Sequence, residues 1–161
     1  MRAMGVLLLL AALISFLGWI PFPARDVAEV TPVKLLCLSA EGGAVQVTSE
    51  TGLSAMGTDA ASAIRRLTEA APGHLLLATV DHVIVTGFRP SAREMLACGL
   101  RPAVKLYDAP RGVSDPPLAE EWLAAREGGV SLGELSDGGD RAALPRLYLR
   151  GGGAEWEDPG E

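Results

Sequence analysis

The residues best equipped for acid–base chemistry stand side by side in this chain, as Asp81-His82. An imidazole changes its charge near neutral pH, and a carboxylate can orient it for proton transfer. Adjacent residues of a strand point to opposite faces of the sheet, however, so this pair cannot share one proton or one metal ion. We therefore expect His82 to be a histidine with satisfied hydrogen bonds near the sheet edge or a helix interface, and His74, in a turn, to be exposed. The residues predict no catalytic group, no cofactor-binding group and no metal ligand.

The other reactive side chains and glycine clusters show no recognised spacing either. Cys37 and Cys98 both lie in apolar runs, which favours two small buried side chains, while a disulfide between them remains open because it is chemically allowed outside the cytoplasm. No Cys or His pair has the spacing of a metal site. Gly42-Gly43 and Gly151-Gly152-Gly153 lack the lysine of a phosphate-binding loop, so we interpret them as turns.

Hydrophobic periodicity predicts the elements that must position these residues. The expected strands span 33–40, 44–49, 75–86, 102–107 and 144–149, and the expected helices span 59–71, 92–98 and 118–126. The first two strands form a hairpin through Glu41-Gly42-Gly43. The run 75–86 is apolar on both alternations, as a central strand covered on both faces would be. Lys105 and Pro145 place the last two strands near edges.

The helices carry start signals and apolar stripes. Thr58 is the expected N-cap of the helix 59–71, and Pro72-Gly73 ends it. Ser91 is the expected cap of the second helix, and Pro116-Pro117 precede the third. The residues expected to face the core are Ala60, Ala63, Ile64, Leu67, Ala71, Leu118, Trp122 and Leu123. Residues 128–140 are expected to be loose and rich in turns.

These elements predict an α+β fold, a mixed β-sheet with packed helices, preceded by one N-terminal transmembrane helix. We assign residues 1–23 to a signal anchor, 24–150 to a single extracytoplasmic domain and 151–161 to a disordered acidic tail. The net charge of −6 arises in the last third of the chain. Because nucleic-acid binding needs clustered Lys and Arg, this charge excludes a nucleic acid as the expected partner.

An uninterrupted apolar run, residues 4–20, follows Arg2 and ends at Pro21-Phe22-Pro23. Its length lies near the lower limit for crossing a bilayer, and Arg2 favours a cytoplasmic start. Cleavage after Ala24 is one alternative, although it would place the bulky Phe22 at a position that needs a small residue. A buried core helix is the other. We expect an uncleaved anchor that holds the chain in the cell membrane by a single pass, with its C-terminal domain outside the cytoplasm.

Several stretches are similar to the amino-terminal domain of the Ger(x)C family, the C subunits of bacterial germinant receptors. Residues 26–30 and the following strand resemble the family's acidic lead-in to its first strand. Residues 57–67 resemble its glycine-initiated helix, and 82–87 resemble the apolar strand ending in glycine. Residues 143–147 match a family segment with a leucine-proline pair. The family's apolar leader ends at a lipid-bearing cysteine, whereas Trp19 and the prolines stand here, so the helix itself is the expected anchor.

This resemblance implies a non-catalytic module on the outer face of a membrane, with the inner membrane of a spore as one candidate. Its partners would be membrane-embedded receptor subunits or another envelope protein, in spore germination or sporulation. It implies no cofactor. The alternative is an envelope hydrolase or sensor whose site is assembled from distant residues, with Asp81, His82, Asp59 and Tyr107 as candidates. That alternative needs an acid or a hydroxyl within about 3.2 Å of His82. A truncated receptor subunit without a partner is a third possibility.

Overall fold

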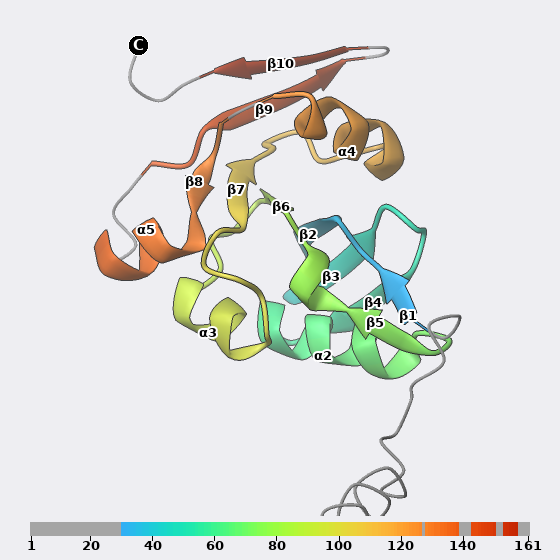
Figure 1. The fold of residues 1–161 in the computed structure, drawn as a ribbon. Helices are drawn as coiled ribbons and strands as arrows, with labels where there is room; N and C mark the ends of the chain where they lie inside the picture. The colour runs from blue at the N-terminus through green and yellow to red at the C-terminus, as the bar shows by residue number, and fades with distance from the viewer. Residues whose placement is uncertain (1–29, 127, 139–142, 151–152, 158–161) are drawn as a thin grey trace, which may run out of the picture.

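A computed structural model of the protein describes residues 30–126, 128–138, 143–150 and 153–157 (Figure 1). The elements in chain order are β1 (Val30–Pro32), β2 (Leu35–Glu41), β3 (Ala44–Ser49), β4 (Ser54–Gly57), α2 (Ala60–Ala70), β5 (His74–Leu76), the 3₁₀ helix η2 (Leu77–Thr79), β6 (His82–Thr86), α3 (Ala92–Ala97), β7 (Lys105–Asp108), α4 (Pro116–Ala124), β8 (Val130–Ser131), α5 (Leu132–Gly138), β9 (Arg146–Arg150) and β10 (Gly153–Glu157). Within these ranges, no helix is long and apolar enough to cross a bilayer. The predicted anchor, residues 4–20, lies outside the described residues.

The main sheet is mixed, as predicted. Its strand order is β10-β9-β7-β6-β2-β3-β4, and β8 pairs with β7 beside this path. β2, β6, β7 and β9 run parallel to their neighbours in this series, whereas β3, β4 and β10 are joined by antiparallel pairing. The fold is therefore α+β, with a parallel centre and antiparallel margins.

Helices cover both faces of the sheet. In Figure 1, α2, α3 and α5 lie on one side of the central strands and α4 lies on the other. Leu36 and Val83 belong to the larger core cluster beneath α2, α3 and α5, while Leu35 and Ile84 belong to a smaller cluster beneath α4. Neighbouring residues of one strand thus point into core clusters on opposite faces of the sheet. This explains why apolar residues in 82–86 occupy both faces of the strand.

The β2–β3 hairpin is confirmed, but its loop is shorter than expected. Glu41 still pairs with Ala44, so the loop consists of Gly42 and Gly43 alone. Their φ angles are 57° and 85°. Two consecutive left-handed residues are what a two-residue loop between twisted antiparallel strands requires.

The predicted long strand 75–86 is interrupted, which corrects the sequence-based expectation. Its first part is β5, which pairs with β1 in a separate two-stranded parallel sheet, and η2 then leads to β6. The Thr79 hydroxyl accepts a hydrogen bond from the backbone N–H of Val33 at 3.1 Å. A side chain that bonds the backbone in this way offers an alternative to continued strand pairing. The central strand is therefore only 82–86.

The region 128–140, expected to be loose, contains β8 and α5. Ser131 and Glu134 form a reciprocal cap: the Glu134 carboxylate accepts from the Ser131 N–H at 2.7 Å, and the Ser131 hydroxyl accepts from the Glu134 N–H at 3.2 Å. This Ser-x-x-Glu pattern is a capping box, and it starts a helix whose Leu132 and Leu135 are buried.

Three further expectations about the second half differ from the structure. β7 is an interior strand despite Lys105, because β6 pairs along one side and β8 and β9 share the other. In α4 the buried residues are Ala119 and Leu123, whereas Leu118 is 43% exposed. Residues 153–157, expected in the disordered tail, form β10 against β9, so that β10, and not β9 with Pro145, is the outer strand.

Candidate functional site

Helix α2 forms one wall of the candidate site, and its first turn fixes its position. The N-cap is Asp59 and not Thr58 as expected: its carboxylate accepts from the Ser62 N–H at 2.7 Å, and the Ser62 hydroxyl accepts from the Asp59 N–H at 3.1 Å. The hydrogen bond from the Ser62 backbone N–H, followed by the Ser62 side chain, lowers the pKa of Asp59, which is fully exposed. The predicted inner residues Ala60, Ala63, Ile64 and Leu67 are buried, while Ala71 is the partly buried C-cap.

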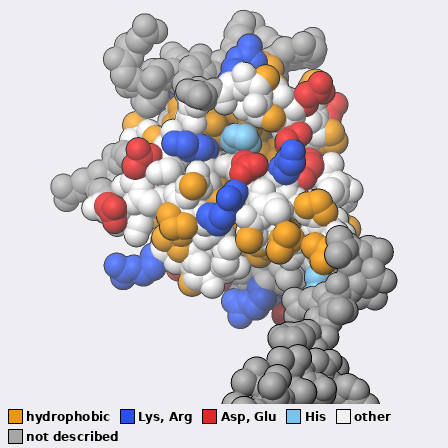
Figure 2. All heavy atoms as spheres, in the orientation of Figure 1, with side chains coloured by type: hydrophobic (Ala, Val, Ile, Leu, Met, Phe, Trp, Pro, Cys, Tyr) orange, Lys and Arg blue, Asp and Glu red, His pale blue; other side chains and the backbone are white. Residues whose placement is uncertain are grey.

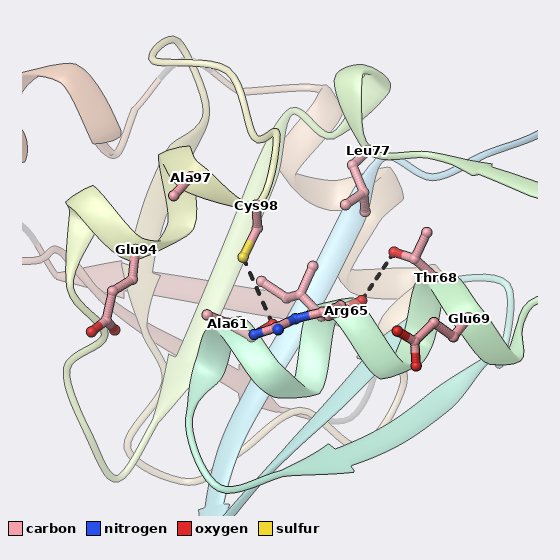
Figure 3. Close-up of a pocket in the computed structure, with 9 residues that line it drawn as sticks. Ala61, Arg65, Thr68, Glu69, Leu77, Glu94, Ala97 and Cys98 are labelled. Carbon is pink, nitrogen blue, oxygen red and sulfur yellow. Dashed lines mark hydrogen bonds between the residues drawn. The ribbon is translucent and has the colours of Figure 1, made fainter.

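The small side chains on the buried face of α2 let this helix lie close to the sheet. The adjacent face of α2 is turned toward α3. Between α2, α3 and η2 lies a groove of about 540 Å³. Figure 3 shows its three sides: Ala61, Arg65, Thr68 and Glu69 along α2, Glu94, Ala97 and Cys98 from α3 and its C-cap, and Leu77 from η2. Ile64 completes the lining.

The floor of the groove is apolar and its rim is charged. Ala61, Leu77, Ala97 and Cys98 supply small or aliphatic surface, and the fully buried Ile64 lies beneath them. A concave apolar floor with a few polar groups is the usual character of a binding site for a ligand or a partner.

Three exposed charged residues form the rim: Arg65 and Glu69 on α2 and Glu94 on α3. The ion pair found among the described residues joins Arg101 to Asp81 elsewhere, so no described residue neutralises the rim carboxylates through an ion pair. On the face shown in Figure 2, acidic and basic side chains are interspersed with apolar ones.

Cys98 lies at the α3 end of the groove as a free, half-buried thiol. Its Sγ lies 3.7 Å from the carbonyl oxygen of Ala61, toward which it donates a weak hydrogen bond across the groove. Burial raises its pKa, so the thiol form dominates at neutral pH. Cys37 is free as well and packs against the cluster on the other face of the sheet. Burial, followed by the charge of Glu50, raises the pKa of Cys37 to about 12.

The structure brings together two of the four residues proposed for an assembled catalytic site. The rings of His82 and Tyr107, on adjacent strands, have centroids 5.9 Å apart. The expectation of a satisfied histidine is wrong for one ring nitrogen, because His82 Nδ1 is buried without a hydrogen-bond partner. Burial lowers the pKa of His82, although the charge of Asp81 opposes this shift, and the ring is therefore neutral at neutral pH. The Tyr107 hydroxyl donates to the carbonyl of Gly128 at 3.1 Å, and burial raises its pKa to about 12.

The two acids of that set lie elsewhere. Asp81 is exposed and bonds Arg101 at 2.7 Å. Asp59 follows β4, whose end at Gly57 pairs with Val45, whereas His82 pairs with Leu35 at the opposite end of the parallel strands. The described parts of the chain contain no group of three His, Cys, Asp or Glu that could hold a metal ion. His74 is exposed, as predicted.

Sequence reasoning missed the groove. Its lining residues come from α2, α3 and η2, and none of them has a reactive pattern in the sequence. The sequence of α2 carried no signal for it, because the groove-facing positions Ala61, Arg65 and Thr68 alternate small, charged and polar side chains, as an ordinary solvent-exposed helix face does. Comparison of the chain with protein-family models, with curated proteins and with solved structures found no match.

Proposed function

We propose that this protein is a membrane-anchored, non-catalytic interaction domain that works outside the cytoplasm and is related to the first domain of germinant-receptor C subunits. Residues 4–20 would be the anchor, and the partners would be membrane-embedded receptor subunits or another envelope protein, in germination or sporulation. The observation that carries the proposal is the groove between α2 and α3, whose apolar floor and charged rim suit a protein partner.

The segments that carry the resemblance can be located in the structure from residue 30 onward. The strand that follows residues 26–30 is β2, residues 57–67 include the end of β4 and most of α2, residues 82–87 are β6 with Gly87, and residues 143–147 lead into β9. Gly87 has a φ of 77°, a conformation that favours glycine, and this accounts for a glycine at the end of that strand.

Thiol labelling in intact cells tests the location. Cys98 is half-buried but borders the groove, whereas Cys37 is more deeply buried. A membrane-impermeant maleimide should label Cys98 of the full chain in intact protoplasts, and Cys98→Ser should abolish the labelling. Labelling that requires lysis would contradict an extracytoplasmic domain. In addition, the membrane-extracted protein should retain Met1 or Arg2, and an amino terminus near Arg25 would show that the run is cleaved.

Cross-linking tests the interaction. A photoreactive amino acid in place of Ala97, in the groove, should yield adducts with membrane proteins encoded beside this chain. The same amino acid in place of Ala124, exposed on α4, should not. Equal adducts at both positions would contradict a specific interaction site.

The alternative, an envelope hydrolase, would use His82 beside Tyr107, but in the described residues no acid or hydroxyl forms a hydrogen bond with the His82 Nδ1, and the Tyr107 hydroxyl bonds Gly128 instead. Chromogenic ester and peptide substrates test it. Hydrolysis that disappears in both His82→Gln and Tyr107→Phe, in protein that stays folded, would favour this alternative over the interaction domain.

A further inference from the structure

We propose that the α2–α3 groove binds a basic amphipathic helix from the membrane-proximal part of a partner protein. This inference rests on the proposed function and names the kind of partner that the groove fits. It is carried by the dimensions of the groove, the charges of its rim and the point at which the chain enters the domain.

The dimensions suit a short helix. Helix α2 has eleven residues and is therefore about 16 Å long. Its groove-facing residues, Ala61, Arg65 and Thr68, follow helical spacing along that length. A partner helix of about three turns that lay along α2 would place an apolar ridge on Ala61, Leu77 and Ala97, as helices do when they dock in grooves. The small side chains at Ala61 and Ala97 allow a close approach.

The charges of the rim favour a partner helix that is positively charged. Glu69 on α2 and Glu94 on α3 stand on opposite walls, and Arg65 contributes one positive charge on the α2 wall. The two carboxylates form no ion pair with a described residue. A partner helix with a lysine or arginine on each side of its apolar ridge would meet one carboxylate on each wall. An anionic lipid surface or a nucleic acid would be repelled by the same groups.

The entry point of the chain places the groove near the proposed anchor. Val30 begins β1 and pairs with His74, the first residue of β5. After the three residues of β5, Leu77 lines the groove, so the groove lies about 10 Å from the entry point. Seven residue steps separate Pro23, the end of the proposed anchor, from Val30, and they span at most about 25 Å. The groove therefore stays within reach of helices that emerge from the same membrane.

A binding assay with a defined probe tests this inference on the full chain in phosphatidylcholine nanodiscs. The probe is a synthetic helix with leucine and alanine at i, i+3, i+4 and i+7 and lysines on both sides of that ridge. The readout is the rate at which maleimide modifies Cys98, followed by mass spectrometry. We expect the basic peptide to slow this modification about tenfold at saturation, and the same peptide with glutamate in place of lysine to leave the rate unchanged.

Two matched pairs of variants locate the binding site. Glu69→Lys combined with Glu94→Lys should raise the dissociation constant of the basic peptide about tenfold, since each exposed ion pair contributes a fewfold and is here replaced by repulsion. Glu120→Lys combined with Glu121→Lys, on α4, changes the same charge and should alter it less than twofold. Ala97→Trp should block the groove sterically, while Ala124→Trp should not.

Four outcomes would overturn the inference. They are equal binding of both peptides, equal effects of the two charge reversals, protection of Cys98 by anionic vesicles, and protection that grows with the concentration of the chain alone. The last two would assign the groove to lipid or to a second copy. The inference fails separately from the proposed function: Cys98 labelling in protoplasts and cross-linking to envelope proteins can succeed while the groove variants have no effect.

Discussion

Replacement of Gly57 by alanine is expected to destabilise the domain by forcing α2 away from the sheet. Gly57 ends β4 and is buried against the first turn of α2. A Cβ at this position would lie 2.8 Å from the Cα of Ala63 and closer still to the Ala63 nitrogen and the Ser62 hydroxyl. The Ala63 N–H is bonded to the Asp59 carbonyl at 3.0 Å. The obstacles therefore belong to the helix backbone and its capping box, which cannot rotate aside as a flexible side chain would.

The expected loss is about 3 kcal/mol, at the upper end of the 1–3 kcal/mol range for inserting one methyl group into a packed core. The value is high because relief requires a shift of a whole helix that buries Ala60, Ile64 and Leu67. Urea unfolding of the full chain in mild detergent, followed by far-ultraviolet circular dichroism, measures this loss. The melting temperature should fall by about 10 °C.

Gly133→Ala is the matched control, because it makes the same chemical change with the opposite expected sign. Gly133 lies in α5, and a Cβ there would meet Pro102 at 3.5 Å, an ordinary contact distance. Alanine in place of a helical glycine should stabilise the domain by about 0.5–1 kcal/mol. If Gly57→Ala left the free energy of unfolding unchanged, or if both variants shifted it equally, the close packing of α2 on β4 would be refuted.

Three further predictions concern the core and the titrating groups. Val83→Asp, at a fully buried position of β6, should cost about 4 kcal/mol or more and unfold the domain by burying an unpaired charge, whereas Lys34→Asp, at an exposed position, should be tolerated in the same urea assay. The pKa of Asp59 is lower in the folded state than in the unfolded state. Its contribution to the free energy of unfolding is therefore fully present above the unfolded pKa of about 3.9 and is lost as pH falls through the folded pKa. Asp59→Asn, which retains a capping oxygen, should make the free energy of unfolding less sensitive to acid. Burial also lowers the pKa of His82, so the free energy of unfolding should decline as pH falls below about 6.5, the unfolded pKa of histidine. His82→Gln should flatten this decline. If the variant and the original protein had the same dependence of stability on pH, the burial of the His82 ring would be contradicted.

The first half of the fold was predictable because local signals and burial agree there. Alternation in 44–49 and the paired glycines 42–43 specify the hairpin, and the stripe Ala60, Ala63, Ile64 and Leu67 specifies α2. The cap was assigned one residue early because Thr58 and Asp59 are both good caps. The reciprocal bond with Ser62 selects Asp59, and the Thr58 hydroxyl bonds only side chains, at Asp59 and Ser62.

The strand 75–86 was overextended because periodicity reports only that residues are apolar. Leu75 pairs in the two-stranded sheet with β1 and Val83 pairs in the main sheet, but both side chains are buried in the same core cluster. Residues of both sheets therefore give the same apolar sequence signal. The break between them depends on Thr79, whose hydroxyl bonds a residue 46 positions away, and a contact at that separation leaves no local trace.

The second half deviates because pairing partners, and not local composition, decide which strands are interior. Lys105 indicates an edge, yet β7 receives β8 along its first half and β9 at its end. β8 comes from the region 128–140, whose glycines and acids suggest a loose loop, and β9 comes from the strand predicted at 144–149, whose pairing partner the sequence does not identify. The capping box at Ser131 and Glu134 was a readable signal for α5, and its four residues lie between turn-forming residues that masked it.

The groove could not be predicted because it arises from a difference in length between two helices. The eleven residues of α2 span about 16 Å, while the six residues of α3 span about 9 Å. Helix α3 therefore covers only part of the face that α2 turns toward it, and Leu77 of η2 closes one end of the uncovered part. Each helix alone is an ordinary amphipathic segment, so no property of either sequence marks the site. An additional turn of α3 that covered Ala61 and Thr68 would remove the groove, and the domain would then offer the rim charges without an apolar floor between them.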